Sequence, residues 1–457
     1  MEELTKLVSN INSFIWGMYC LIPLLCGVGI YFTIRLKFIQ VRKFGQAVRM
    51  LFGDLSLKGK RADKHGMSSF QSVATAIAAQ VGTGNLAGAA TAIAMGGPGA
   101  IFWMWIAAFF GMATIFAEAV LAQVYRTRDD AGHITGGPAY YISKGLGSHK
   151  LAVFFSVSII IALGCIGNMV QSNSIADAFK TAFDVPPLVM GLIIAACGAF
   201  VFFGGIGRIA AVTEKMVPLM ALLYVIGGLF VVLSNADQII PAFKMIFVGA
   251  FDPSAATGGI IGAGVKEAIR YGVARGLFSN ESGLGSAPIA AAAARTSQPV
   301  VQALISMTQT FIDTLVVCSM TGLVILVTGV WTSGKHGAPL TSYAFETGLP
   351  GELGGLIVTI GIILFAYSTI LGWSYYGEKA IEYLLGSKAI IPYRWAFIIS
   401  VGLGASMKLD LVWTLSDIFN ALMAFPNLIG LIMLTPVVKA ETLAYLRSLK
   451  KEPASEG

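Results

Sequence analysis

Residues 79–90 read AQVGTGNLAGAA, and residues 278–290 read FSNESGLGSAPIA. Each stretch is a polar, glycine-rich interruption of a long apolar run, and the two lie in opposite halves of the chain. Inside a bilayer every backbone N–H and C=O needs a partner, so a broken helix is tolerated only where it is buried or lines a cavity. The two stretches therefore predict two broken transmembrane helices that lie side by side at a functional site.

The composition of the chain places these breaks in a membrane protein. Of 457 residues, 56% are hydrophobic and 12% are charged, and the mean hydropathy is +0.76. A soluble domain usually carries about 25% charged residues, so the simplest solvent for this chain is a lipid bilayer. The five cysteines lie in apolar runs without a CxxC pair, which indicates neither a disulfide framework nor a metal site.

Apolar runs bounded by charges, glycine and proline predict an all-α membrane protein with eleven transmembrane helices. The connection 35–66 is rich in Lys and Arg, so the positive-inside rule places it in the cytoplasm and the N-terminus outside. Eleven crossings then leave the C-terminus in the cytoplasm, and we expect the protein in the plasma membrane. The helices are expected at residues 12–34, 68–95, 98–125, 151–179, 185–204, 208–233, 262–294, 299–329, 353–379, 392–407 and 411–435.

The charges outside the predicted spans are better explained by the membrane topology than by binding to a charged partner. The net charge of +7 comes mostly from basic residues in connections predicted to be cytoplasmic. No basic patch with interleaved aromatic residues lies elsewhere, so nucleic-acid binding is not expected. No HExxH, GxSxG or acidic metal motif lies in a predicted span, so we expect no enzyme. We expect the chain to act as a monomer.

The chemistry of the two breaks suits a zwitterion. Free N–H groups at the end of one half-helix favour an anion, and free carbonyls at the end of the other favour a cation. An amino acid carries both charges close together, and paired breaks in two halves of a chain are typical of secondary transporters. The alternative is that small residues only allow close helix packing, which does not explain Asn280 and Glu281.

The predicted spans also form two matching units. Five spans begin with the first break and five with the second, and because five is odd the second unit enters the membrane from the opposite side. This predicts a 5+5 inverted repeat behind one extra N-terminal helix. The expected segments are the extra helix and basic loop (1–66), the first repeat (67–234), an outside connection with the second repeat (235–435) and a cytoplasmic tail (436–457).

The break regions carry a family resemblance. Residues 96–111, GGPGAIFWMWIAAFFG, and residues 276–288, GLFSNESGLGSAP, are similar to signatures of the sodium:alanine/glycine symporter family, and the resemblance covers nearly the whole chain. It implies a LeuT-type fold and alternating access. It also implies sodium-coupled symport of small neutral amino acids, such as alanine and glycine, into the cell.

The resemblance implies a substrate site at the breaks. Backbone N–H groups of residues 82–84, in an unwound segment at about 80–85, would bind the substrate carboxylate. The carbonyls of residues 278–279 and the amide of Asn280 would face its ammonium group. The expected substrate-binding residues are Gln80, Gly82, Thr83, Gly84, Gln171, Phe278, Ser279, Asn280 and Trp373. Gln171 would line the cavity and Trp373 would limit it to small side chains, although either could be an ordinary packing residue.

The resemblance further implies a sodium site. The stretch FAYSTILGW at 365–373 supplies two adjacent hydroxyls, and Na⁺ as coupling ion prefers hard oxygen ligands. Matching the common sodium site of LeuT-type folds adds backbone carbonyls. The expected ligands are Ala78, Val81, Phe365, Ser368 and Thr369. The alternative is that both hydroxyls bond only to carbonyls of their own helix.

Glu281 departs from LeuT itself, whose second break has no acidic residue. It could hold Asn280 or a backbone N–H from behind the site, or it could titrate. A proton-coupled permease is therefore the closest rival to the sodium symporter. An open channel is less well supported, because two occluding breaks favour alternating access.

Overall fold

Helices form nearly all of the fold in the computed structural model. The structure describes residues 2–17, 19–53, 68–129, 132–252, 264–351, 353–407 and 409–451. Much of the predicted basic loop (54–66) and the end of the predicted tail (452–457) lie outside the described residues. The N-terminal region contains α1 (Glu2–Ile15), α2 (Leu21–Arg35), α3 (Ile39–Arg42) and α4 (Phe44–Gly53).

The first predicted span is interrupted. Instead of one helix over 12–34, α1 ends at Ile15 and α2 begins at Leu21. The Trp16 indole lies in the turn between them and donates a hydrogen bond to the Asp417 carbonyl oxygen at 2.9 Å. The turn is therefore held by a residue from the far end of the chain, which a local sequence pattern does not reveal.

After this N-terminal region, the rest of the first half of the chain begins with α5, a helix that has a capping box. Ser68 Oγ accepts from the Gln71 N–H at 3.1 Å, and Gln71 Oε1 accepts from the Ser68 N–H at 3.3 Å. The elements are α5 (Ser69–Gln80), a π-helical turn (Gly84–Gly88), α6 (Ala89–Gly96), α7 (Ala100–Val124), β1 (Thr127–Arg128), β2 (Ile134–Thr135), α8 (Pro138–Gly145), α9 (His149–Ile161), a second π-helical turn (Ala162–Gly167), α10 (Asn168–Phe183), α11 (Pro187–Phe202) and α12 (Gly205–Ser234). The antiparallel β1–β2 pair is a small departure from the all-α expectation.

The second half of the chain also contains a broken helix and several long helices. Its elements are a 3₁₀ turn (Ala236–Gln238), α13 (Ile239–Gly249), α15 (Val265–Asn280), α16 (Ala287–Ala293), α17 (Pro299–Thr310), a third π-helical turn (Phe311–Cys318), α18 (Ser319–Val327), a 3₁₀ turn (Val330–Thr332), α19 (Gly337–Gly348), α20 (Leu353–Leu385), a 3₁₀ turn (Ser387–Ala389), α21 (Ile390–Gly404), α22 (Leu409–Met433) and α23 (Thr435–Lys451).

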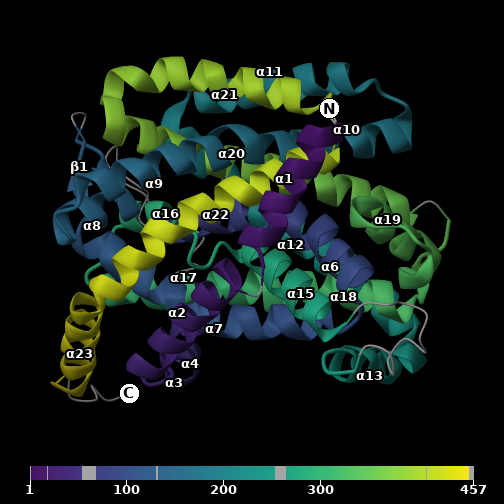
Figure 1. The fold of residues 1–457 in the computed structure, drawn as a ribbon, viewed down its shortest axis with the longest axis horizontal. Coiled ribbons are helices and arrows are strands. Elements are labelled where there is room, and N and C mark those ends of the chain that lie inside the picture. Colours follow the sequence, from purple (N-terminus) through teal and green to yellow (C-terminus); the bar gives the residue numbers. More distant parts are fainter. Residues whose placement is uncertain are drawn as a thin grey trace.

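The broken helices pack against each other in the middle of the bundle. α15 contacts α6 and the π-helical turn before it, and α16 contacts α5, so the half-helices of the two breaks lie side by side. α20 packs against α5, α10 and α12, whereas α11 and α21 pair at one edge (Figure 1). Nearly all residues of both breaks are buried, so the packing places the polar stretches in the interior.

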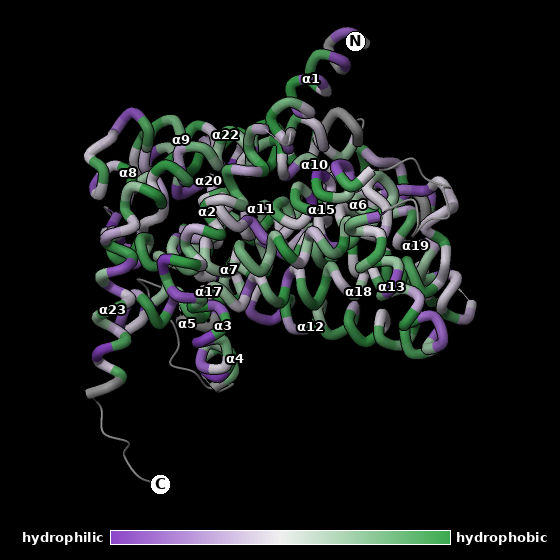
Figure 2. Tube along the Cα trace, turned by 60° about the horizontal axis from the view of Figure 1, so that its bottom comes forward, coloured by the Kyte–Doolittle hydropathy of each residue, from purple (hydrophilic) through white to green (hydrophobic). Residues whose placement is uncertain are grey.

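The outer surface is apolar, as a lipid-facing surface should be. Large apolar side chains are exposed on α11, α12 and α21, among them Leu192, Phe200, Leu222, Leu233 and Ile399. Such an extended apolar surface would be unfavourable in water. Figure 2 shows hydrophobic residues along most of the helical body, with α1 and α23 projecting from it at opposite ends of the view.

Six helices in the described residues are long and apolar enough to cross a membrane, and α2 and α11 are shorter apolar helices. The two broken helices and α21 do not meet this length criterion as continuous helices, so length alone does not establish eleven crossings. The six are Ala100–Val124, His149–Lys180, Gly207–Ser234, Pro299–Val327, Leu353–Leu385 and Trp413–Met433.

Candidate functional site

The first break is shorter than the sequence predicts. α5 ends at Gln80, and the chain resumes a helical path at Thr83, before the π-helical turn. The Gly82 N–H donates to Asn85 Oδ1 at 2.9 Å, and the Thr83 N–H donates to Gln171 Oε1 at 3.3 Å. The break thus presents backbone donors that side-chain amide oxygens satisfy in this structure.

The second break is longer than the first, and its nonhelical segment lies within the stretch 278–290 that the sequence singled out. α15 continues to Asn280, Glu281 adopts a left-handed conformation with φ of 58°, and α16 begins at Ala287. Gly283 and Gly285 lie between them with φ of 83° and 88°, a conformation that favours glycine. The predicted carbonyls of residues 278–279 therefore belong to the last turn of α15, whose final carbonyls lack partners within the helix.

The two breaks touch directly. Gln80 Nε2 donates to the Asn280 carbonyl oxygen at 3.1 Å across the interface. A Cβ added at Gly84 would lie 3.1 Å from Ser279 Cα, so the backbones approach as closely as a glycine allows. The structure thus brings the predicted substrate-binding residues of both stretches together.

The Asn280 side chain stabilises the second break. Its Oδ1 accepts from the Ser282 N–H at 3.0 Å, and its Nδ2 donates to Thr314 Oγ1 at 2.9 Å. The amide that we expected to face a substrate ammonium group is thus engaged with the protein.

Asp313 is a buried carboxylate that received no role from the sequence. It lies in the π-helical turn 311–318, where Oδ1 accepts from Asn85 Nδ2 at 2.7 Å and from Ser279 Oγ at 3.0 Å. Oδ2 accepts from Thr314 Oγ1 at 2.8 Å. Asp313 therefore connects the two breaks. An aspartate inside an apolar span was the signal that could have identified it.

Four of the five predicted sodium ligands converge. Ser368 Oγ donates to the carbonyl oxygens of Ala78 at 3.2 Å and Phe365 at 2.9 Å, and Thr369 Oγ1 donates to the same two oxygens at 3.1 and 3.0 Å. Among the described residues, no hydrogen bond joins the Val81 carbonyl to this group. Two hydroxyls and two carbonyls form the hard oxygen set that fits Na⁺.

Trp373 and Glu281 are bonded to each other. Trp373 Nε1 donates to Glu281 Oε1 at 2.6 Å, and Ser286 Oγ donates to Glu281 Oε2 at 2.7 Å. The Trp373 ring also packs edge-to-face on Phe278, with 6.3 Å between centroids. Glu281 does not hold Asn280, since their side chains bond to different partners. The bond to Trp373 was not expected from the sequence.

The site contains carboxylates without a basic partner and polar atoms without a hydrogen bond. Within the described residues, no Lys, Arg or His forms an ion pair with Glu118, Glu281 or Asp313, all of them buried. Gln80 Oε1 and Thr83 Oγ1 are buried without a partner among the described residues. Buried polar atoms are normally hydrogen-bonded, so Gln80 Oε1 and Thr83 Oγ1 can bond to a polar ligand.

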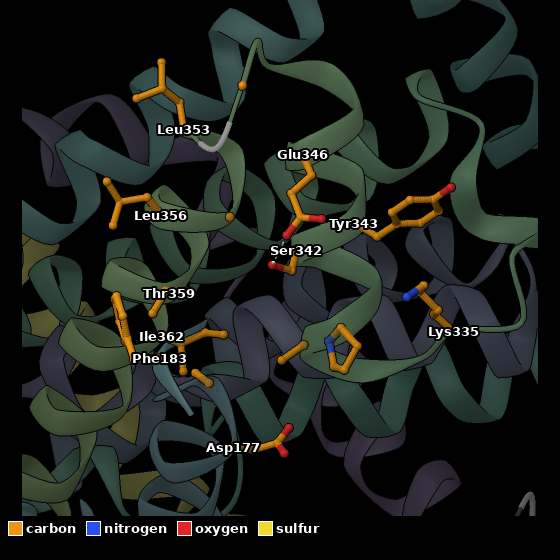
Figure 3. A pocket seen from close by; sticks show the side chains of 15 residues that line it. Asp177, Phe183, Lys335, Ser342, Tyr343, Glu346, Leu353, Leu356, Thr359 and Ile362 are labelled. Atoms are coloured by element: carbon orange, nitrogen blue, oxygen red, sulfur yellow. Dashed lines mark hydrogen bonds between the residues drawn. The ribbon is translucent and has the colours of Figure 1, made fainter. Parts of the chain in front are cut away.

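A separate cavity of about 810 Å³ lies between α10, α19 and α20. Its lining includes Asp177, Lys335, Glu346 and Ile362 (Figure 3). It contains none of the predicted site residues, but Ile362 precedes Phe365 by less than one turn of α20. The cavity therefore lies beside the site and is not the site itself.

The fold compares with that of a solved transporter. MhsT in complex with L-phenylalanine matches with a TM-score of 0.51 at 12% identity, over 82% of this chain and 100% of that chain. At this identity the likeness shows the fold alone, which is the LeuT-type fold. The fold, the apolar spans and the buried polar breaks define the class: a helical, multi-pass membrane protein.

The sequence relatives identify the family. The profile of the sodium:alanine symporter family matches residues 1–456. The chain is 50% identical to the sodium/alanine symporter AgcS of Methanococcus maripaludis over 459 residues, covering 98% of this chain and 99% of that protein. It is 41% identical to the probable sodium/glutamine symporter GlnT of Bacillus subtilis over 456 residues, covering 99% and 93%. The chain belongs to the sodium:alanine symporter family.

Proposed function

We propose that this protein couples the entry of Na⁺ to the uptake of small neutral amino acids, alanine and glycine, by alternating access. The observation that carries the proposal is the direct contact of the two breaks beside the oxygen cluster of Ala78, Phe365, Ser368 and Thr369. A transporter needs no covalent chemistry at such a site, so we propose no enzymatic activity and no nucleic-acid partner.

The proposed carboxylate position is at the first break. Asn85 Oδ1 and Gln171 Oε1 accept hydrogen bonds from the N–H groups of Gly82 and Thr83. A substrate carboxylate oxygen offers the same kind of acceptor, with a charge that strengthens the bond. On this proposal, the carboxylate takes over the Thr83 N–H from Gln171 and the Thr83 hydroxyl gains a partner. The ammonium group faces the carbonyl end of α15.

The proposed sodium site uses the hydroxyls of α20 and the end of α5. The Ser368 and Thr369 hydroxyls would turn their lone pairs toward the ion, with the carbonyls of Ala78 and Phe365 and, as a fifth ligand, that of Val81. Because Ala78 and Val81 belong to the broken helix, ion binding would stabilise the geometry of the first break. This gives a physical route for coupling ion binding to substrate binding.

The proposed membrane arrangement has eleven crossings, with an outside N-terminus and a cytoplasmic C-terminus in the plasma membrane. Residues 67–234 and 235–435 would form the inverted repeat, behind the N-terminal segment 1–66 and before the tail 436–457. The two crossings of broken helices, 69–96 and 265–293, support this arrangement because they occupy corresponding positions. We propose that the protein acts as a monomer.

The decisive experiment is uptake into proteoliposomes. Labelled alanine and glycine are supplied with an inward gradient of Na⁺, of K⁺ or of H⁺. Accumulation that requires Na⁺ supports the proposal, and Glu281→Gln should remain Na⁺-dependent and pH-independent. Accumulation under the proton gradient alone would replace Na⁺ as the coupling ion. Uptake of glutamine but of neither small amino acid would overturn the proposed substrate.

A further inference from the structure

The bond between Glu281 and Trp373 joins the second break to α20. At 2.6 Å it is short, as expected when the acceptor is charged. Glu281 occupies the left-handed position with which the nonhelical segment of the break begins. Both side chains are at least 98% buried, so bulk water does not compete for the bond in the intact protein.

Trp373 is also confined by its neighbours. A Cβ added at Gly167 would lie 2.7 Å from Trp373 Cζ3, so the ring rests directly on the glycine backbone of the second π-helical turn. Phe278 contacts the ring edge-to-face, with an interplanar angle of 85°. The ring thus lies between the second break and the helix that carries Gln171, one turn of α20 beyond Thr369.

We propose that Glu281 is a positioning residue that sets the size of the substrate side chain. Its carboxylate holds the indole N–H, and thereby fixes the large face of Trp373 as a wall of the substrate pocket. Without an acceptor the buried indole N–H lacks a hydrogen-bond partner, which is unfavourable. Rotation of the ring toward another acceptor then lowers the free energy. The pocket then admits longer side chains. This inference rests on the proposed function and assigns Glu281 a role that needs no proton transfer.

Ser286 provides a matched control. Its hydroxyl bonds to the other carboxylate oxygen of Glu281, so Ser286→Ala removes a bond of similar length and leaves the bond to Trp373. Glu281→Gln keeps an oxygen that can accept from the indole. Only Glu281→Ala, or Glu281→Ser with its shorter side chain, removes the acceptor.

The experiment measures kcat/KM for alanine and for 2-aminobutyrate, which is one methylene longer, in proteoliposomes with a Na⁺ gradient. A tight pocket rejects one extra methylene by about 10-fold or more. We expect the wild-type protein, Glu281→Gln and Ser286→Ala to keep this ratio and Glu281→Ala to lose most of it. In a Trp373→Phe background, adding Glu281→Ala should not change the ratio further.

Other results would overturn the inference. If Glu281→Ala keeps the wild-type ratio, or lowers transport of both substrates equally, Glu281 does not set substrate size. The same conclusion follows if Glu281→Ala changes the ratio as much with Phe at position 373 as with Trp. Should Glu281→Ala not fold, Glu281→Ser carries the same expectations. A wild-type protein that transports no small amino acid under any gradient would instead overturn the proposed function and this inference with it.

Discussion

Ser368 and Thr369 each bond to two carbonyl oxygens, one on their own helix and one on the first broken helix. The bond to Phe365 is the back-bonding that Ser and Thr commonly make within a helix. The bond to Ala78 is different, because it joins residues about 290 positions apart. Back-bonding alone does not explain a second acceptor on another helix, and the proposed sodium site would use these same four residues.

We predict that Ser368→Ala and Thr369→Ala each raise the Na⁺ concentration for half-maximal alanine uptake about 10-fold. Loss of one hydrogen-bonding or ligating group to a charge costs about 1.5–3 kcal/mol, and about 1.4 kcal/mol corresponds to tenfold. Ser374→Ala is the control, because this buried hydroxyl on the same helix bonds only to the Leu371 carbonyl oxygen among the described residues. An equal shift in all three variants would contradict a local sodium site.

The glycines of the first break give a second prediction. A Cβ at Gly82 would collide with Thr369 Oγ1 and lie 3.3 Å from Gln171 Oε1, so Gly82→Val should abolish alanine binding. Calorimetric titration of the detergent-purified protein measures this. Gly27→Ala is the control, since nothing lies within 4 Å of a Cβ there. Normal binding by Gly82→Val would show that the substrate binds elsewhere.

At the scale of the elements, three π-helical turns in the described residues contribute to the candidate site or lie against it. They are residues 84–88 after the first break, 162–167 beneath Trp373 and 311–318 around Asp313. A π-helical turn inserts an extra residue into a helix and often occurs at a functional site. Here each turn lies beside a residue that the proposed site uses.

A buried ion pair links α15 and α22. Arg275 on α15 binds Asp417 on α22 through two hydrogen bonds of 3.0 and 2.7 Å, and the guanidinium lies over the Trp413 ring at 5.1 Å. The two side chains are 12% and 7% exposed. Breaking a buried pair is costly because the remaining charge stays in a medium of low polarity.

We therefore predict that Asp417→Asn destabilises the protein by up to about 3 kcal/mol, visible as a lower melting temperature in detergent. Asp184→Asn is the control, because its pair with Lys180 is exposed and such pairs contribute little. Equal melting temperatures for the two variants would mean that the α15–α22 contact does not depend on this pair.

At the scale of the whole molecule, further buried ion pairs lie near the C-terminal end of α20. Lys379 lies between Asp129 and Glu382 at 3.2 and 2.7 Å, and Arg394 binds Glu378 at 2.8 Å. These pairs join α20 to the β1–β2 hairpin region and to α21.

The proposed orientation gives the whole-molecule prediction. In a background without the five native cysteines, a membrane-impermeant maleimide should label Lys335→Cys on intact cells and Lys439→Cys only after the cells are opened. Both lysines are exposed in the structure. Labelling of Lys439→Cys on intact cells would reverse the orientation inferred from the basic loops.

The residues of the candidate site could be selected from the sequence where the pattern is local. Ser368 and Thr369 are neighbours on one helix, and the glycines and amides of each break stand out against apolar flanks. The extents of the breaks were not predictable. The first is short because Asn85 satisfies the Gly82 N–H. The second is long because Glu281 turns left-handed and bonds to Trp373, 92 residues away.

The sequence by itself determined that the protein lies in a membrane, that it is helical, where both polar breaks are and which family it belongs to. These properties follow from composition and from short patterns that neighbouring residues carry. Only the tertiary structure decided that α1 and α2 separate at Trp16, that Asp313 connects the two breaks, and that Glu281 bonds to Trp373. The reason is physical: buried polar groups must find partners, and in a helix bundle those partners come from segments distant in sequence.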